Sequence, residues 1–199
     1  MMTEERTVKR GRPRDPAVDQ AILEAARYAL ARKGFTGASM DEIARRAGVG
    51  KDTLYRRYKS KEELVLQLLK VISEQTVKAP DLEDARYALF LFLQAIRKVN
   101  RDTDLGPVIA GVVGESARNE RLADGFEGFW RDRRSIPAAL VRRIAPEGTT
   151  DEEIEVILDH ILGPIYYRLL LTGAPIDDEY LWDLIGTIPW SSEYELEQI

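Results

Sequence analysis

The chain has 199 residues, of which 44% are hydrophobic and 32% are charged, a balance typical of a soluble globular protein. No apolar stretch approaches the roughly 20 residues that a membrane-spanning helix needs, and the basic N-terminus lacks an apolar signal core. The absence of cysteine excludes disulfides and thiolate metal sites, so we expect a cytoplasmic protein without membrane partners, metal or other cofactor.

The net charge of −5 hides an uneven distribution. Residues 1–61 carry 15 Lys and Arg against 8 Asp and Glu, a net charge of +7, whereas the remaining residues carry 14 against 26, a net charge of −12. A basic first third on an acidic body indicates that one end of the molecule meets a polyanion.

Helical periodicity recurs along the chain and strand patterns are nearly absent, so we predict an all-α protein of about nine helices. The first helix is predicted over residues 16–33, because Gly34 can adopt the left-handed conformation that ends a helix. Ser39 with Glu42 has the spacing of a capping box, as has Ser60 with Glu63. The later helices are predicted near residues 39–47, 50–58, 60–79, 82–96, 105–115, 118–145, 154–169 and 180–188.

Residues 39–64, SMDEIARRAGVGKDTLYRRYKSKEEL, carry the pattern that indicates function. Two short helices joined by a tight Ala-Gly-Val turn form a helix-turn-helix, in which Ala44 lets the helices cross closely and Gly48 supplies the turn. Val49 and Leu54 point back to the core, and the second helix is the one that enters the major groove of DNA. Its outward side is predicted to carry Lys51, Asp52, Thr53, Tyr55, Arg56 and Arg57.

Residues 17–65 resemble the DNA-binding domain of the tetracycline-repressor (TetR) family. The matching positions are Gly34-Phe35, Ser39, Ile43-Ala44, Ala47-Gly48-Val49, Thr53-Leu54-Tyr55, Tyr58, Lys61-Glu62 and Leu64. The resemblance implies a homodimeric repressor of transcription that binds double-stranded DNA at a near-palindromic operator and is released by a small-molecule inducer. The two recognition helices of such a dimer would lie about 34–36 Å apart in successive major grooves.

The resemblance assigns DNA contacts to individual residues of the recognition helix. The hydroxyls of Thr53 and Tyr55 would donate to phosphates, and Lys51 or Arg56 would pair with guanine. Asp52 departs from the small residue common at its position, and it either accepts from a cytosine amino group or stabilises the helix N-terminus.

Positions outside the recognition helix carry further expectations. Ser39 and Lys61 lie at helix N-termini that the family presents to the DNA backbone, where free N–H groups favour phosphate. Two interpretations, a solvated side chain and a phosphate contact, stay open for three residues, namely Arg45, Arg46 and Lys59.

The basic leader that precedes the first helix resembles an AT-hook, because it has a Gly-Arg-Pro core flanked by basic residues. One interpretation places Arg12 and Arg14 in a narrow A·T minor groove beside the major-groove site. The other is a disordered tail that adds only nonspecific attraction.

The C-terminal half is expected to dimerise and to enclose the inducer, as the resemblance implies. Residues 163–173 also resemble, more weakly, the C-terminal domain of one TetR subgroup. The interface is predicted on two apolar stripes, which comprise Ile154, Leu158, Ile161, Ile165, Leu181, Leu184 and Ile185. The aromatic residues that either line a pocket or form plain core are Phe90, Phe92, Phe126, Phe129, Trp130 and Tyr166. Arg168 is either a snorkelling side chain or an anion partner.

We therefore expect three regions: a basic arm at residues 1–15, a helix-turn-helix domain at 16–61, and a regulatory and dimerisation domain at 62–199. Nothing points to an enzyme, because His160 is the only histidine and no phosphate loop or nucleophile elbow appears. Two alternatives to the regulator stay open: a small-molecule sensor or dimerisation module with weak or lost DNA binding, and a constitutive DNA-architectural protein without an inducer.

Overall fold

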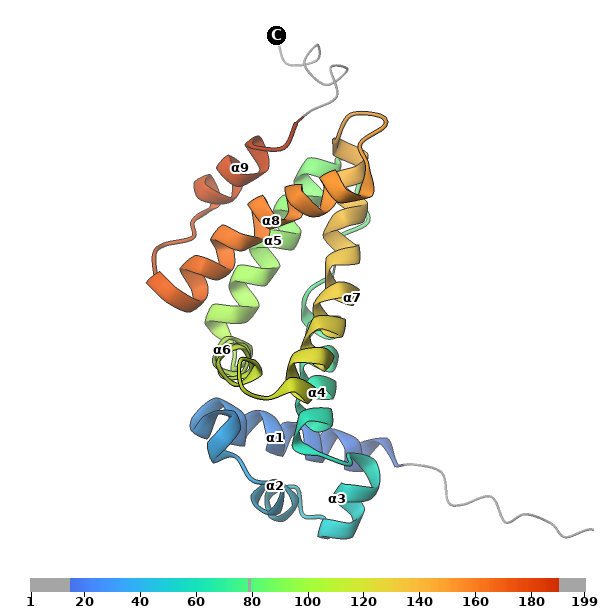
Figure 1. The fold of residues 1–199 in the computed structure, drawn as a ribbon, viewed down its shortest axis with the longest axis vertical. Coiled ribbons are helices and arrows are strands. Elements are labelled where there is room, and N and C mark those ends of the chain that lie inside the picture. The colour runs from blue at the N-terminus through green and yellow to red at the C-terminus, as the bar shows by residue number, and fades with distance from the viewer. Residues whose placement is uncertain (1–14, 79, 190–199) are drawn as a thin grey trace, which may run out of the picture.

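A computed structural model describes residues 15–78 and 80–189, and within them the protein is all-α with nine α-helices and no strand, as the sequence predicts (Figure 1). The helices are α1 (Pro16–Gly37), α2 (Met40–Arg46), α3 (Lys51–Arg57), α4 (Lys61–Thr76), α5 (Ala85–Asp102), α6 (Leu105–Ser116), α7 (Glu120–Ile144), α8 (Asp151–Tyr167) and α9 (Asp178–Gly186), with a π-helical turn, η1 (Arg168–Thr172), between the last two. Arg12 and Arg14 lie outside the described residues.

The helix boundaries follow from local chemistry, with one correction. Gly34 has a φ of 66°, as expected of a helix-ending glycine, but the chain resumes a further helical turn to Gly37 after this kink. Ser39 and Ser60 cap their helices by accepting from the backbone N–H groups of Glu42 and Glu63.

The capping boxes predicted at these two serines are incomplete. The carboxylate of Glu42 pairs with Lys33 instead, and that of Glu63 accepts from the backbone N–H of Lys59. A complete capping box forms at α8, where Thr150 and Glu153 exchange both hydrogen bonds.

The molecule has two regions, joined by α4 (Figure 1). The unit of helices α1–α3, which contains the predicted helix-turn-helix, forms one end, and the body, α5–α9, stands above it, with α6 packed across α1. A Cβ atom at Gly111 of α6 would lie 3.7 Å from the backbone nitrogen of Phe35, so the two helices approach closely at the kink of α1. Helix α4 begins at the predicted domain boundary, residue 61, and packs on both α1 and α7.

The apolar stripes of α8 and α9 lie inside the subunit, which corrects the predicted dimer interface. The side chains named for it are all buried, namely Ile154, Leu158, Ile161, Ile165, Leu181, Leu184 and Ile185. They face the other helices of the body, since α8 packs on α7 and both α5 and α8 contact α9. The wide apolar face of each of these helices is therefore buried within a single chain.

No helix in residues 15–78 or 80–189 combines the length and apolar character needed to cross a bilayer.

Candidate nucleic-acid interface

Helix α3 is held by a small core beneath it. Leu54 is fully buried, and it packs in the same core as Ile43 and Ala44 of α2. Gly48 has a φ of 68°, and the N–H of Val49 donates to the carbonyl of Ala44 at 3.0 Å, which closes the turn between the helices. Because the buried side chains fix one face of α3, the opposite face is presented outward.

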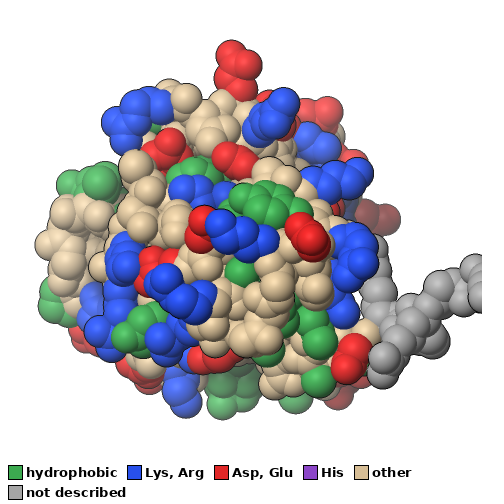
Figure 2. Space-filling view, turned by 90° about the horizontal axis from the view of Figure 1, so that it is seen from below, with side chains coloured by type: hydrophobic (Ala, Val, Ile, Leu, Met, Phe, Trp, Pro, Cys, Tyr) green, Lys and Arg blue, Asp and Glu red, His purple; other side chains and the backbone are tan. Residues whose placement is uncertain are grey.

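The outward face of α3 carries most of the residues predicted to meet DNA. Lys51, Asp52, Tyr55 and Arg56 are exposed, and Thr53 is half-buried. Figure 2 looks onto the end of the molecule that includes α2 and α3, where Lys and Arg side chains are spread across the surface with Asp and Glu between them. Tyr55 is 46% exposed, so its hydroxyl is accessible from solvent on this face.

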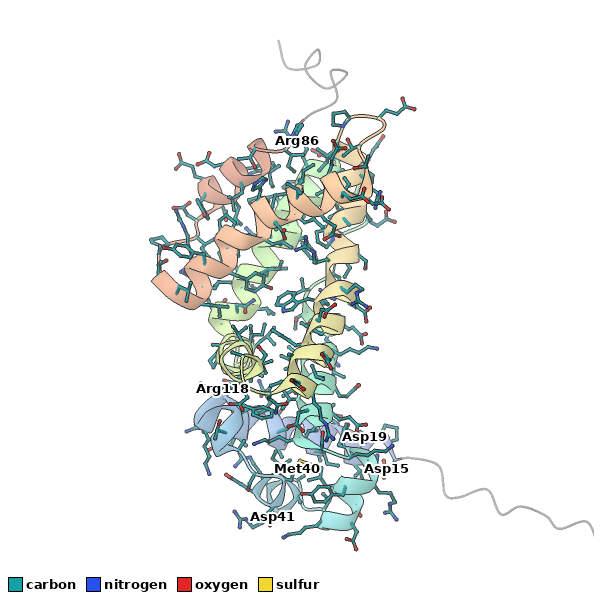
Figure 3. All side chains as sticks on the ribbon, in the orientation of Figure 1. Asp15, Asp19, Met40, Asp41, Arg86 and Arg118 are labelled. Atoms are coloured by element: carbon teal, nitrogen blue, oxygen red, sulfur yellow. The ribbon has the colours of Figure 1, made fainter. Side chains whose placement is uncertain are left out.

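Lys51 already has an anionic neighbour in the free protein. Its ammonium pairs with the carboxylate of Asp41 on α2, labelled in Figure 3, and both side chains are more than half exposed. An exposed pair of this kind contributes little to stability, so a phosphate or a guanine can replace the carboxylate at small cost.

Arg57 turns away from the outward face, which corrects its predicted role. Its side chain is only 13% exposed, and its guanidinium lies 2.5 Å from a carboxylate oxygen of Asp19 on α1. The side chain therefore positions α3 on α1, and it is not presented to DNA.

Lys61 and Ser39, for which phosphate contacts were predicted, make hydrogen bonds within the fold. The Lys61 ammonium donates to the carbonyl oxygens of Phe35 and Ala38 at 2.6 Å and 3.0 Å, and it lies 4.3 Å from the centre of the Phe35 ring. The Ser39 hydroxyl accepts from the N–H of Glu42 at 3.2 Å. Lys61 thus satisfies carbonyl groups at the end of α1, and two of its three N–H donors are used within the fold.

Sequence reasoning missed a stacked cluster behind the helix-turn-helix. The guanidinium of Arg46 lies 3.3 Å from the centre of the Tyr28 ring, and that of Arg32 lies 4.5 Å from the same ring. Cation–π stacking therefore holds Arg46 against α1. The i, i+4 spacing of Tyr28 and Arg32 was the available signal.

A second site, a narrow cavity in the body, contains part of the predicted pocket. Trp130 and Tyr166 line it, as do Phe92 and Phe129. Phe126 does not line it and packs on Phe129 and Trp130 instead, with ring centroids 5.9 Å and 5.6 Å apart. Sequence reasoning missed the other lining residues, among them the polar Asn100 and Arg133, because nothing in their local pattern places them inward.

Two other predictions about the body are resolved by contacts outside this cavity. Phe90 stacks on Trp182 of α9 at 4.7 Å and does not line this cavity. Arg168 lies over the ring of Tyr180 at 3.4 Å and donates to the carbonyl of Pro175, which makes it a structural side chain. The described residues hold no cluster of three His, Asp or Glu side chains suited to a metal ion.

The fold and the exposed α3 define a helix-turn-helix DNA-binding regulator. Two family models together match most of the chain: "Bacterial regulatory proteins, tetR family" at residues 22–68 and "Tetracyclin repressor-like, C-terminal domain" at residues 79–188. The chain belongs to the TetR family of bacterial transcriptional regulators.

Individual relatives agree with this assignment. The chain is 33% identical to the HTH-type transcriptional regulator YdeS of Bacillus subtilis, over 89% of this chain and 90% of that one. It is 27% identical to the DNA-binding transcriptional repressor TetR of Mycobacteroides abscessus, over 84% and 90% of the two chains. The crystal structure of the TetR family transcription regulator SCO0332 has a TM-score of 0.69 at 28% identity, covering 84% of this chain and 94% of that one.

Proposed function

We propose that the protein binds a near-palindromic operator as a homodimer, represses transcription there in the cytoplasm, and is released by a small molecule bound in its body. The observation that carries the DNA contact is the outward face of α3, where Lys51, Thr53, Tyr55 and Arg56 stand on a helix fixed by buried Leu54. Tyr55 and Thr53 would donate to phosphates, and Lys51 or Arg56 would read guanine. Repression is supported by the M. abscessus relative, whose name describes a repressor.

The homodimer is supported by apolar side chains left exposed on the last elements of the body. Val156 of α8 is 53% exposed, Tyr167 is 56% exposed, and Leu171 of η1 is 76% exposed. Exposed apolar groups of this size on neighbouring elements are typical of a subunit interface. Two copies would then place their α3 helices about 34–36 Å apart, the spacing of successive major grooves.

Release by a ligand is supported by the contacts that join the body to the DNA-binding unit. Thr36 at the end of α1 donates to Glu115 of α6 at 3.1 Å, and Asn119 donates to Glu62 of α4 at 3.0 Å. A ligand that displaces α4 or α6 would therefore move the helix-turn-helix. A coupling of a few kcal/mol between ligand and DNA is enough for such regulation. Catalysis plays no part in this proposal.

The experiment is fluorescence anisotropy with the DNA upstream of the protein's own gene, at several salt concentrations, against a scrambled duplex of equal length. We expect specific binding with a steep salt slope. Equal affinity for both duplexes would overturn the operator proposal and favour a sensor that has lost its DNA binding. Light scattering at micromolar concentration tests the dimer, and a monomer would contradict the palindromic arrangement.

A further inference from the structure

The cavity in the body is enclosed by helices α4 to α8, whose side chains fill the space between the ribbons in Figure 3. Its volume is about 30 Å³, room for a water molecule or two. Aromatic rings form much of its wall, and the Trp130 and Tyr166 rings meet edge to face with centroids 4.9 Å apart.

Asn100 brings an unpartnered acceptor to this apolar wall. Within the described residues, two polar residues, Ser73 and Asn100, are buried, and both line the cavity. The Asn100 side chain is 8% exposed, and its amide nitrogen donates to the carbonyl of Ile96 at 2.9 Å. Its Oδ1 atom is buried and meets no donor in that part of the chain. A buried acceptor without a donor is costly, so it indicates a place for a hydrogen-bonding ligand.

Arg133 brings a cation without a direct ion pair in the described residues, since Glu74 of α4 acts on it only through longer-range attraction. Its Nη2 donates to the backbone carbonyl of Val77 at 2.7 Å, yet no carboxylate among residues 15–78 and 80–189 lies within 4 Å of its guanidinium. The neighbouring Arg134, by contrast, pairs with Glu155 at 2.6 Å and with Asp159 at 2.9 Å. Burial lowers the pKa of Arg133, and it raises the pKa of the Tyr166 phenol, which therefore stays neutral and offers no negative charge.

A route from solvent reaches the same side chains. An open groove between α4 and α7 is lined by Phe129 and Arg133, which also line the cavity. Arg133 therefore lines both the groove and the cavity, and its guanidinium is within reach of an anion that enters the groove.

We propose that the cavity binds an aromatic acid that also carries a hydroxyl or N–H donor. Its carboxylate would pair with Arg133, its donor would satisfy Oδ1 of Asn100, and its ring would lie among Phe92, Phe129 and Trp130. This inference rests on the proposed ligand response and names the class of ligand. A ring needs more room than the cavity has, so the ligand widens it, and Arg133 exchanges the Val77 carbonyl for the carboxylate.

The experiment uses the full-length protein and a series of 4-hydroxyphenyl acids with zero to three methylene groups between ring and carboxylate. Binding is followed by calorimetry and by tryptophan fluorescence, since Trp130 lines the cavity. We expect at least one acid to bind ten-fold or more tightly than both its carboxamide and its methyl ether. The inference is overturned if no member of the series exceeds both analogues, or if an unbranched aliphatic acid binds as tightly as the best of them.

Variants then assign each part of the ligand to its residue. Arg133→Gln should weaken binding of the acid at least ten-fold while leaving the carboxamide unchanged. Arg121→Gln is the matched control, because Arg121 lies on the same helix and lines the groove but not the cavity. Equal losses in the two arginine variants would overturn the assignment.

Asn100→Leu should remove the preference for the hydroxyl over the methyl ether. If this variant does not fold, the comparison of hydroxyl and methyl ether on the wild-type protein still tests the donor.

DNA binding is measured separately, so that the two proposals fail differently. An acid that binds without changing operator affinity overturns ligand release and leaves this inference standing. Operator binding by a protein that ignores the whole series overturns this inference alone.

Discussion

The DNA-binding unit and the body are both helical, but their polar groups are used differently. In the unit, charged side chains join the ends of helices, as Arg57 does with Asp19 and Lys61 with the carbonyls of Phe35 and Ala38. In the body, wide apolar faces pack together, and the buried Asn100 is left with an unsatisfied acceptor. The charged groups of the unit thus join its helices to one another, whereas the body holds a buried neutral acceptor that a ligand can satisfy.

The largest effect is expected from neighbouring substitutions on α3 that separate its two faces. Leu54→Ala removes a fully buried side chain and should lower the free energy of unfolding by about 2–5 kcal/mol. Tyr55→Ala should leave that free energy within about 0.5 kcal/mol of wild type, because the ring is 46% exposed. Urea denaturation followed by circular dichroism measures both.

The affinity for operator DNA should depend on the exposed Tyr55 side chain, although the stability does not. Measured well below the unfolding transition, Tyr55→Ala should weaken binding by about 1–3 kcal/mol if the hydroxyl meets DNA. A destabilised Tyr55→Ala protein, or one with wild-type affinity, would contradict the division of α3 into an inner and an outer face.

A second effect concerns the ion pair that ties α3 to α1. Arg57→Met keeps the apolar stem but leaves Asp19 without its partner, and we expect a loss of about 1–2 kcal/mol, since Asp19 is one-third exposed and partly screened. A double-mutant cycle with Asp19→Asn should give a coupling near about 1 kcal/mol. Additive losses would show that the pair does not hold the two helices together.

In the body, a polar-to-apolar substitution should raise the free energy of unfolding. Asn100→Leu removes the unpartnered acceptor and places an apolar side chain against the aromatic wall of the cavity. We expect the free energy of unfolding to rise by about 1 kcal/mol, which corresponds to about 2–4 °C in Tm. A large destabilisation would mean that Asn100 serves the fold rather than a ligand.

The smallest effect is a pH dependence at the surface of the unit. Hydrogen bonds from the Lys33 ammonium, at 2.7 Å to each oxygen, lower the pKa of the Glu42 carboxyl below its ordinary value. A carboxyl whose pKa is lower in the folded state contributes stability above its unfolded pKa and loses it as the pH falls through the folded value. Wild type should therefore exceed Glu42→Gln slightly in stability at neutral pH.

The difference should close on acidification, and thermal melts between neutral pH and about pH 3 measure it. Lys33→Met should reduce the difference, since it removes the hydrogen-bond donor and leaves only the attraction of Arg45 and Arg46. A difference that widens on acidification would have the wrong sign for this pair.

The sequence predicted the fold class and the helix-turn-helix because both depend on local patterns. Helical periodicity, the Ser39 and Ser60 caps and the glycine at position 48 act within a few residues, and the structure confirms each of them. The outward side of α3 follows from the same periodicity once Leu54 is placed in the core.

What the sequence did not predict depends on contacts between distant segments. In the sequence Arg57 cannot be distinguished from its neighbour Arg56, and only the ion pair with Asp19 on another helix separates their roles. The stripe that contains Ile154 and Leu158 suits a subunit interface and a subunit core equally well, and only the packing of α8 on α7 decides between them. Asn100 and Arg133 stand out only when five helices enclose one cavity.

The most direct test of the account compares Arg56 with Arg57 in operator binding as a function of salt. Arg56→Gln should lower the affinity and, if the side chain meets phosphate, reduce the slope of log K against log salt by about 1 for each subunit. Arg57→Gln, measured where the protein is fully folded, should keep the wild-type slope because its guanidinium faces Asp19. Equal losses of affinity in the two variants, or no loss in either, would contradict the claim that the outward face of α3 is the DNA-binding surface.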